Sequence, residues 1–395
     1  MLHIITHLGV GGAQDNTILT LQKHDRENFE VYLAASPGAL WENRARQATD
    51  YFYPCPDLAH PISPLKDIKC LWKLASIIRK ENIDIVHTHS SKAGILGRLA
   101  AVLAKVPFVV HTVHGFAFHD FMPTWKRNFY IFLERSVSLV TDFFLTVSEL
   151  NRQEAISLRI MSENNSKTVY SGIDYSHLDS TGNSDDLKAS LDISPDDATI
   201  LMVGRLDEQK APYYLIDAFS KVTKQHPNTQ LLFVGDGVLR DRLEAQVESL
   251  QLNQKVKFLG SRQDVPHILS ICDIFALSSL WEGLGRAMTE AMLVSKPVVV
   301  PDIYGIPEIV HHNETGLLYP AKDVNQLAKH ISYLLEHPEE RQRLGQNAKV
   351  LTRRLFSADK MVKDIESIYY SLIESRTSVP REQRDYNLPP VSQSA

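Results

Sequence analysis

Short runs of β-branched and aliphatic residues alternate with longer amphipathic stretches along almost the whole chain. In the first half, runs such as Leu2–Leu8 and Phe108–His114 are apolar throughout, and the stretches between the runs carry apolar residues at helical spacing. Strands without a polar face are typical of parallel sheets that helices cover on both sides. The same rhythm begins again at Thr199. Two such series predict an α/β protein with two doubly wound domains rather than one barrel.

A polar seam separates the two series. The stretch Ser171–Asp197 is rich in Gly, Asn, Ser and Asp and poor in large hydrophobic residues. We place the boundary near residue 180, with a first domain over 1–180 and a second over 181–358. Asp359–Ser375 is predicted to be a helix, and the polar, proline-bearing tail 376–395 is predicted to be disordered.

The charge balance argues against one large class of function. The 395 residues include 42 basic and 47 acidic side chains, a net charge of −5, and neither half is basic. A protein that binds nucleic acid by neutralising phosphates needs the opposite balance. The three cysteines form no CxxC pair, which favours a reducing compartment over a disulfide framework or zinc knuckle. We expect neither a signal peptide nor a transmembrane span, and hence a soluble cytoplasmic protein.

Glycines and charges gather where strands are predicted to end, which is where open α/β sheets bind ligands. The first strand leads into Gly9–Gln14, whose glycines would let backbone N–H groups approach an anion at a helix N-terminus, although a plain tight turn explains the segment equally well. Arg205 and Lys210 follow a strand of the second half and could straddle two phosphates. Solvated surface charges are the competing interpretation of that pair. Gly235–Gly237, taken alone, is a turn.

The segment Ser279–Glu290 combines several such features. It is predicted to end a strand and open a helix, and its backbone N–H groups at Gly283–Gly285 suit a diphosphate or a sugar hydroxyl. Glu282 and Glu290 suit vicinal diols, because a carboxylate accepts two hydrogen bonds and a diol donates two. A first-turn glutamate favoured by the helix dipole is an equally good interpretation of Glu290.

Taken together, four motifs resemble those of glycosyltransferase family 4. They are Gly11-Gly-Ala13, Val113-His-Gly115, Val203-Gly-Arg-Leu206 with Lys210, and Glu282-Gly-Leu-Gly285 with Glu290. The resemblance covers roughly residues 1–370, with the motifs in order. It implies a GT-B fold, in which two Rossmann-like domains face a central cleft and a C-terminal helix crosses back onto the first domain. It also implies retaining transfer of a sugar from a nucleotide diphosphate sugar, without a metal or another cofactor.

The same resemblance implies roles for single residues. Arg205 and Lys210 match the pair that binds the diphosphate and neutralises the leaving group. Glu282 matches the carboxylate that holds hydroxyls of the donor sugar, and Glu290 matches the carboxylate on the ribose diol. His114 matches the active-site histidine near the donor sugar. The other donor-binding positions that the resemblance implies are Gly11, Gly12, Gly260, Ser261, Arg262, Gly283, Leu284 and Gly285.

The chemistry agrees with this assignment. Departure of a diphosphate develops negative charge, which preorganised cations and amides stabilise. Asp185-Asp186 and Asp196-Asp197 lie in the polar seam rather than in a convincing metal-binding context, so metal independence is expected. Arg286 stands where many family members carry a hydrophobic or small residue, and this departure leaves the identity of the donor sugar open.

Histidines cluster in the first half, at His87, His89, His111, His114 and His119. Two histidines that alternate on a strand could share a face and bind zinc. Because no Asp, Glu or Cys accompanies them at ligand spacing, we interpret them either as histidines at strand ends whose hydrogen bonds are satisfied within the protein or as residues that hydrogen-bond a sugar.

Two further segments lie on the predicted acceptor side. Ser90 and Lys92 end a strand and open a helix, so they either contact the acceptor or belong to a helix N-cap formed by Ser90 or Ser91. The aromatic stretch after His114 either packs in the core or forms an interfacial helix at a membrane. Its membrane candidates are Phe116, Phe118, Trp125, Lys126 and Arg127.

We therefore predict a glycosyltransferase that uses a nucleotide diphosphate sugar, with UDP as the expected nucleotide. The expected acceptor is a lipid-linked saccharide in the synthesis of a surface polysaccharide, which would place the enzyme at the inner face of a membrane. Three alternatives stay open: a GT-B epimerase that acts on the nucleotide sugar itself, transfer to a small-molecule acceptor, and a degenerate transferase kept as an assembly partner.

Overall fold

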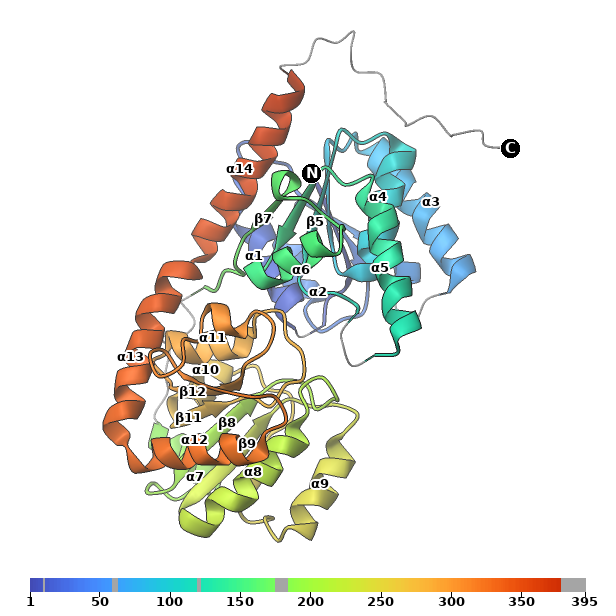
Figure 1. Ribbon diagram of the computed structural model, residues 1–395. Coiled ribbons are helices and arrows are strands. Elements are labelled where there is room, and N and C mark those ends of the chain that lie inside the picture. Colours follow the sequence, from blue (N-terminus) through green and yellow to red (C-terminus); the bar gives the residue numbers. More distant parts are fainter. Residues whose placement is uncertain (10, 59–62, 119–121, 175–183, 378–395) are drawn as a thin grey trace.

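The computed structural model describes residues 1–9, 11–58, 63–118, 122–174 and 184–377 (Figure 1). Within these ranges the chain forms two α/β domains, each built on one parallel sheet. The predicted boundary near residue 180 and the end of the tail lie outside the described residues. Residues 376 and 377, which we assigned to the disordered tail, are helical instead, because the last helix continues to Thr377.

Seven described strands form the sheet of the first domain, and all neighbouring pairs are parallel. In spatial order they are β3 (Tyr51–Pro54), β2 (Tyr32–Ser36), β1 (Leu2–His7), β4 (Ile85–His89), β5 (Phe108–Val113), β6 (Phe143–Thr146) and β7 (Ser166–Thr168). The strand order reverses between β1 and β4. In doubly wound sheets such a reversal opens a crevice at the carboxyl ends of the strands, where ligands bind.

Six described strands form the second sheet, which repeats this topology. In spatial order they are β10 (Val256–Phe258), β9 (Thr229–Val234), β8 (Ala198–Val203), β11 (Ile274–Ala276), β12 (Val298–Pro301) and β13 (Leu317–Tyr319). The reversal here lies between β8 and β11. The loops that follow these two strands carry the Arg205, Lys210 and Glu282 motifs.

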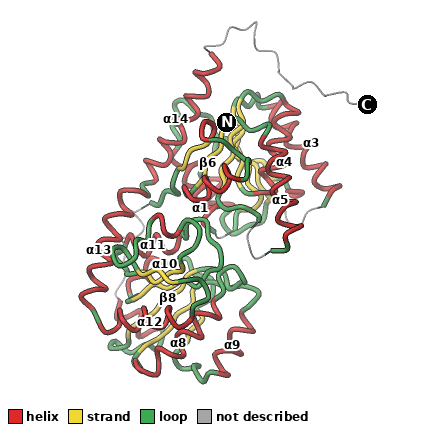
Figure 2. The backbone as a smooth tube through the Cα atoms, in the orientation of Figure 1, coloured by secondary structure: helices red, strands yellow, loops and turns green. Residues whose placement is uncertain are grey.

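Helices cover both faces of each sheet (Figure 2). Those of the first domain are α1 (Gly12–Lys23), α2 (Glu42–Gln47), α3 (Pro64–Lys80), α4 (Ser91–Ala104), α5 (Thr124–Ser138) and α6 (Glu149–Ser157). Those that follow are α7 (Ser184–Ser190), α8 (Pro212–Gln225), α9 (Arg240–Ser249), α10 (Val265–Ser270), α11 (Arg286–Leu293), α12 (Val324–Glu336), α13 (Pro338–Leu355) and α14 (Ala358–Thr377). Within the described ranges, no helix combines the length and apolarity needed to traverse a bilayer.

Helix α14 returns from the second domain to the first (Figure 1). It contacts α1, and its residues Val362, Ile365, Ile368 and Tyr369 are buried in the same apolar cluster as Ile5 of β1. Burial of several large side chains, each worth about 1.5–3 kcal/mol, anchors the helix on the first domain. The crossing helix that the resemblance implied is thus present.

The polar seam contains structure that its composition does not indicate. Ser184–Ser190 forms α7, and Leu187 of this helix is buried in the apolar cluster of the second domain. The three cysteines, Cys55, Cys70 and Cys272, are free and buried. Burial raises the pKa of the Cys55 thiol to about 11, so this sulfur stays protonated at neutral pH.

Candidate active site

The glycine-rich loops of the two domains meet at the carboxyl ends of the sheets. Gly283 lies in the loop between β11 and α11, and a Cβ atom placed on it would stand 2.6 Å from the backbone oxygen of His114, just after β5. A Cβ atom on Gly12, the first residue of α1, would stand 3.4 Å from the Cβ of Arg286. The loops that the sequence singles out in each half are therefore close neighbours in space.

Lys210 and Glu282 form an ion pair in which both side chains are largely buried. Nζ of Lys210 binds Oε1 of Glu282, and the two side chains are 16% and 6% exposed. Ser279 donates its hydroxyl to the same oxygen at 2.7 Å. The pair joins the loop after β8 to the loop after β11, so a cation and a carboxylate meet at the reversal of the second sheet.

Arg205 lies on the same loop and is more accessible. Its side chain is 64% exposed, forms an ion pair with Asp207 at 3.0 Å and donates to the side-chain oxygen of Gln209 at 2.7 Å. Gln209 in turn donates to the backbone oxygen of Trp281 at 3.0 Å. Arg205 is thus tied through Gln209 to the segment that carries Glu282. Both predicted cations therefore lie at the carboxyl end of the second sheet.

Arg286 connects three parts of the chain. From the start of α11 it forms an ion pair with Asp15 of α1, contacts Glu290 of its own helix at 3.1 Å and donates to the backbone oxygen of Gly172 at 3.0 Å. Burial and the nearby Asp15 carboxylate raise the pKa of Glu290, and Arg286 opposes this shift. The residue that departs from the usual family pattern is therefore a contact between the two domains.

Comparisons with known proteins match both halves of the chain. The model described as "Glycosyltransferase Family 4" matches residues 10–177, and the model described as "Glycosyl transferases group 1" matches residues 183–351. The UDP-Gal:alpha-D-GlcNAc-diphosphoundecaprenol alpha-1,3-galactosyltransferase of Escherichia coli is 30% identical over 373 residues, which cover 93% of this chain and 95% of that protein. The chain belongs to glycosyltransferase family 4.

Two further matches describe the neighbourhood of this family 4 member. The N-acetyl-alpha-D-glucosaminyl L-malate synthase of Bacillus anthracis is 28% identical over 320 residues, 78% of this chain and 80% of that protein. The crystal structure of Anabaena HepE in complex with UDP and glucose superposes with a TM-score of 0.82 at 21% identity, and the match covers 94% of this chain and 99% of that one. The structural match shows the fold, and the predicted GT-B architecture is confirmed.

Gly285 and Leu284 complete the loop around Glu282 in this glycosyltransferase. Gly285 is the N-cap of α11 and has a φ of +85°, a left-handed conformation that residues with a Cβ atom rarely adopt. Leu284 is buried in the core of the second domain. The apolar anchor and the glycine together turn the chain sharply at the N-terminus of α11, where backbone N–H groups are free of helical partners.

The positions predicted for the nucleobase form a neighbouring corner of the family 4 fold. Gly260 follows β10 with a φ of +67°, and its backbone oxygen accepts a hydrogen bond from the Gly235 N–H at 2.8 Å. Arg262 is partly exposed and pairs with Asp264 at 2.6 Å. The corner lies next to the Arg205 loop, because a Cβ on Gly235 would clash with the backbone oxygen of Gly204.

His114 belongs to a buried group of histidines. Its Nε2 lies 3.1 Å from Nδ1 of His89, and burial, assisted by Arg286, lowers its pKa to about 4. The ring nitrogens of His3, His87 and His89 lie within 4.8 Å of one another, close enough to hold a metal ion. All six of those nitrogens already have hydrogen-bond partners, so the arrangement fits hydrogen-bonded histidines better than a zinc site. His119 lies outside the described residues.

The two predicted acceptor-side residues face inward. The Ser90 hydroxyl bonds the Thr6 hydroxyl at 2.8 Å, which ties the end of β4 to the end of β1, and the side chain forms no N-cap bond to α4. Lys92 is buried and forms an ion pair with Asp67 of α3 at 2.7 Å. Ser90 thus occupies the N-cap position of α4, but the competing interpretation of a side-chain N-cap bond from it does not hold, because its hydroxyl bonds Thr6 across the sheet.

The aromatic segment divides into a buried and an exposed part. Phe118 is buried, stacks on Phe116 and lies beneath the guanidinium of Arg127, so a membrane contact by Phe118 is contradicted. Its ring fills a small apolar cluster beside β5 and β6 instead. Trp125, by contrast, is 74% exposed and Lys126 is exposed, both on the first turn of α5.

Glu308 is a contact between the domains that the sequence reasoning missed. Its carboxylate accepts hydrogen bonds at 2.8 Å from the Ser148 hydroxyl and from the backbone N–H of Glu149, which together form the N-terminus of α6. It also accepts from the hydroxyl of Tyr170 at 3.1 Å. Only the capping serine before α6 signals this site, and nothing near Glu308 in the sequence indicates a partner in the other domain.

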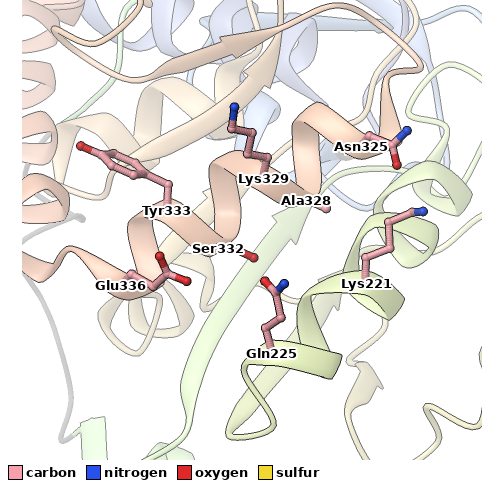
Figure 3. Close-up of a pocket in the computed structure, with 8 residues that line it drawn as sticks. All are labelled: Lys221, Gln225, Asn325, Ala328, Lys329, Ser332, Tyr333 and Glu336. Carbon is pink, nitrogen blue, oxygen red and sulfur yellow. The ribbon is translucent and has the colours of Figure 1, made fainter.

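A hollow of about 450 Å³ lies between α8 and α12 (Figure 3). It is lined by polar side chains such as Lys221 and Gln225. No residue predicted for the active site lines it, and we do not assign it to the reaction.

Proposed function

We propose that this glycosyltransferase transfers a sugar from UDP-sugar to a lipid-linked saccharide, with retention and without a metal ion, during synthesis of a surface polysaccharide. The observation that carries the proposal is the Lys210–Glu282 pair, which lies beside the loop that contacts His114 across the domains. The nucleotide and the acceptor class are supported by the activity for which the Escherichia coli relative is named and by the UDP in the HepE structure.

Lys210 and Arg205 would stabilise the charge that develops on the departing diphosphate. Lys210 is held in place by Glu282, so it needs no reorganisation when the donor binds. Arg205 is exposed and tied to Gln209, and its planar fork suits two phosphate oxygens. These two cations would supply the positive charge that a metal ion supplies in other transferases.

Glu282 would hold the donor sugar. Within the described part of the structure, Lys210 and Ser279 both donate to Oε1 of its carboxylate. The other carboxylate oxygen would then accept from a sugar hydroxyl, and we assign the N–H groups of Gly283 and Gly285 to the same substrate. Glu290, held by Arg286, would take the ribose hydroxyls.

A paired substitution tests the role of Lys210. Lys210→Met keeps the length of the side chain and removes its charge, and we expect transfer to fall by about 10²–10³-fold in a folded protein. Lys221→Met makes the same change on the exposed face of α8 and serves as the control. Equal transfer rates in the two variants would refute the assigned role.

Ligand binding tests the nucleotide. In a thermal-shift comparison of UDP-, GDP- and ADP-sugars, only the UDP-sugars should raise the unfolding temperature, since ligand at 100 times its Kd adds about 2.7 kcal/mol of stability. Incubation with UDP-sugar alone separates transfer from epimerisation, because an epimerase would form an isomeric nucleotide sugar. The malate synthase relative makes a small acceptor the second candidate, and competition between L-malate and a lipid-linked saccharide would decide between them.

An exposed apolar face supports the lipid-linked acceptor. Trp125, Phe129 and Phe132 follow one another at helical spacing on α5 and are 74%, 51% and 63% exposed. On α3, Leu65 and Trp72 are 84% and 57% exposed. Exposed lysines alternate with the apolar residues of α3, at Lys66, Lys69 and Lys73. Large apolar side chains beside basic ones are typical of helices that lie on an anionic membrane surface.

Vesicle binding tests this face. We expect the protein to cosediment with anionic vesicles, and Trp125→Ala with Lys126→Glu to weaken binding by about tenfold. The control is Val350→Ala with Lys349→Glu, on α13 of the second domain. It likewise truncates an exposed apolar side chain and reverses the neighbouring lysine charge, and it should bind vesicles like the wild type. Absence of wild-type binding would remove the membrane proposal and leave the transferase proposal intact.

A further inference from the structure

Four histidines form a continuous hydrogen-bonded row from His114 to helix α14. His114 Nε2 lies 3.1 Å from His89 Nδ1, and His89 Nε2 lies 3.0 Å from His3 Nδ1. His3 Nε2 lies 3.2 Å from His24 Nε2, and His24 Nδ1 lies 2.9 Å from Oε1 of Glu366. The row therefore crosses the first domain from the end of β5, through β4 and β1, to the residue that follows α1 and then to α14.

The histidines of the row are neutral at physiological pH. His3, His24 and His89 are buried, and burial lowers the pKa of each of them. A neutral imidazole carries one N–H donor and one acceptor nitrogen. Each ring in the row must then donate on one side and accept on the other, so the whole row has a single direction.

Glu366 determines which direction this is. Its Oε1 accepts the backbone N–H of Asp25 at 2.9 Å and lies at the same distance from His24 Nδ1. A carboxylate oxygen that already accepts a backbone N–H cannot donate, so His24 must carry its proton on Nδ1. His3 and His89 then carry theirs on Nε2, and so does His114.

We propose that Glu366 is a positioning residue that fixes His114 as the Nε2–H tautomer, so that Nδ1 presents a lone pair to a hydroxyl of the bound sugar. His114 is partly accessible, whereas His89 behind it is buried, so the outer nitrogen is the one that substrate can reach. An acceptor nitrogen there favours a hydroxyl, which can donate a hydrogen bond to it. A phosphate or carboxylate has no proton to donate, so its lone pairs would be repelled by that of Nδ1. The tautomer assignment does not depend on the proposed function. Only the identification of the ligand as a sugar hydroxyl rests on the proposed function.

Tyr369 provides a matched control one turn along the same helix. Its hydroxyl lies 2.5 Å from Nδ1 of His87, whose Nε2 bonds the Thr112 hydroxyl at 2.6 Å. His87 is as buried as the row and packs against His89, yet none of its hydrogen bonds leads to His114. Tyr369→Phe therefore removes a bond between α14 and a sheet histidine, keeps the ring that packs against His24, and removes no hydrogen bond of the row.

Long-range ¹H–¹⁵N spectra of the full-length protein, with the His114 signals assigned through His114→Gln, test the tautomer directly. In the wild type we expect His114 and His89 to be protonated on Nε2 and His24 on Nδ1. Glu366→Ala should give His114 both tautomers, because nothing then sets the direction. Glu366→Gln, which keeps an oxygen at this position, should restore the wild-type pattern, and Tyr369→Phe should not change it.

Kinetics separate positioning from stability. We expect kcat/KM for transfer to fall about tenfold in Glu366→Ala, the loss of roughly one hydrogen bond, and to stay at the wild-type value in Glu366→Gln and Tyr369→Phe. A wild-type His114 protonated on Nδ1, or equal responses of Glu366→Ala and Tyr369→Phe at His114, would overturn the inference. If the spectra show the expected tautomers but the protein has no transferase activity, the proposed function is refuted and the inference about Glu366 is not.

Discussion

Gly283 shows how a single residue can hold two domains at a fixed distance. Its Cα approaches the backbone oxygen of His114 so closely that a Cβ atom would stand 2.6 Å away. The backbone of His114 cannot move out of the way as the end of a flexible side chain can. The absence of a side chain at Gly283 therefore determines how closely the loop of Glu282 approaches the end of β5.

Gly283→Ala should therefore move the loop rather than unfold the protein. We expect transfer to fall by about 100-fold, the usual order for a displacement of about 1 Å at a reacting centre. The measurement is kcat/KM beside a thermal unfolding curve, and the unfolding temperature should stay within a few degrees of the wild type. An alanine variant with normal kinetics would show that the loop is not held against His114 during catalysis.

The candidate site could be predicted from the sequence only where a residue and its motif lie together. Glu282 and Lys210 each stand in a recognisable segment, and their meeting follows from adjacent strand ends. Asp15 and Glu308 could not be found in this way, because their partners Arg286 and Ser148 belong to the other domain. Ordinary helix and turn positions carry no mark of a contact that only the domain arrangement creates.

At the scale of the element, the sequence predicts best what is most regularly apolar. Strands such as β1 and β5 were predicted to within two residues, because β5 is buried along its whole length and β1 at every residue but the last, His7. The edge strand β3 was missed, since its side chains are partly exposed and it ends in a proline. Helix α13 was missed because few of its residues are buried, so its apolar period is weak.

The buried histidines in and beside the first sheet make the stability of the first domain depend on pH. Burial lowers the pKa of His3, His24, His87, His89, His111 and His114 below the usual 6.5. Below pH 6.5 the unfolded chain therefore binds more protons than the folded one, and the free energy of unfolding falls as the pH falls. Each histidine contributes at most about 1.4 kcal/mol per pH unit, and for His114 the loss continues to about pH 4.

Urea unfolding between pH 7.5 and 4.5 measures this dependence. We expect full stability above pH 7 and a steep loss that begins near pH 6.5, before most carboxylates take up protons. A free energy of unfolding that stays constant between pH 7 and 5 would contradict the burial of neutral histidines. Fluorescence of Trp41, which packs against the apolar cluster of the first domain, would follow the unfolding of this domain in a variant whose other three tryptophans are replaced by phenylalanine.

At the scale of the whole molecule, Glu308 fastens the second domain to the first. It accepts hydrogen bonds from the N-terminus of α6, where the helix dipole also favours a negative charge. Hydrogen bonds to a charged group contribute about 1.5–3 kcal/mol, and the loss of Glu308 would leave donors on α6 unsatisfied. The relative position of the domains thus depends on a few polar contacts.

Glu308→Ala should shift the molecule toward an open arrangement. We expect a larger radius of gyration in small-angle X-ray scattering and a KM for the donor sugar raised about tenfold, with kcat changed less. Glu314→Ala, on a nearby exposed loop, removes the same charge and should leave both quantities unchanged. Identical scattering from the two variants would show that Glu308 does not hold the domains together.

The two-domain architecture could be predicted because each half repeats one pattern, and the strand order of the two sheets is the same apart from the additional edge strand β7 of the first. How the halves approach each other could not, since it depends on Arg286, Glu308 and Gly283 together. The placement of α14 followed from the family resemblance rather than from its own residues.

The return of α14 to the first domain has a consequence for how the protein is made. Val362 and Ile365 complete an apolar cluster whose other members, such as Ile5, leave the ribosome at the very start of translation. The half that is synthesised first is thus the half that finishes folding last, and its uncovered surface must wait while the intervening polypeptide emerges. Such a nascent chain is expected to bind chaperones. An N-terminal fragment expressed alone would keep this apolar surface exposed and would be prone to aggregate.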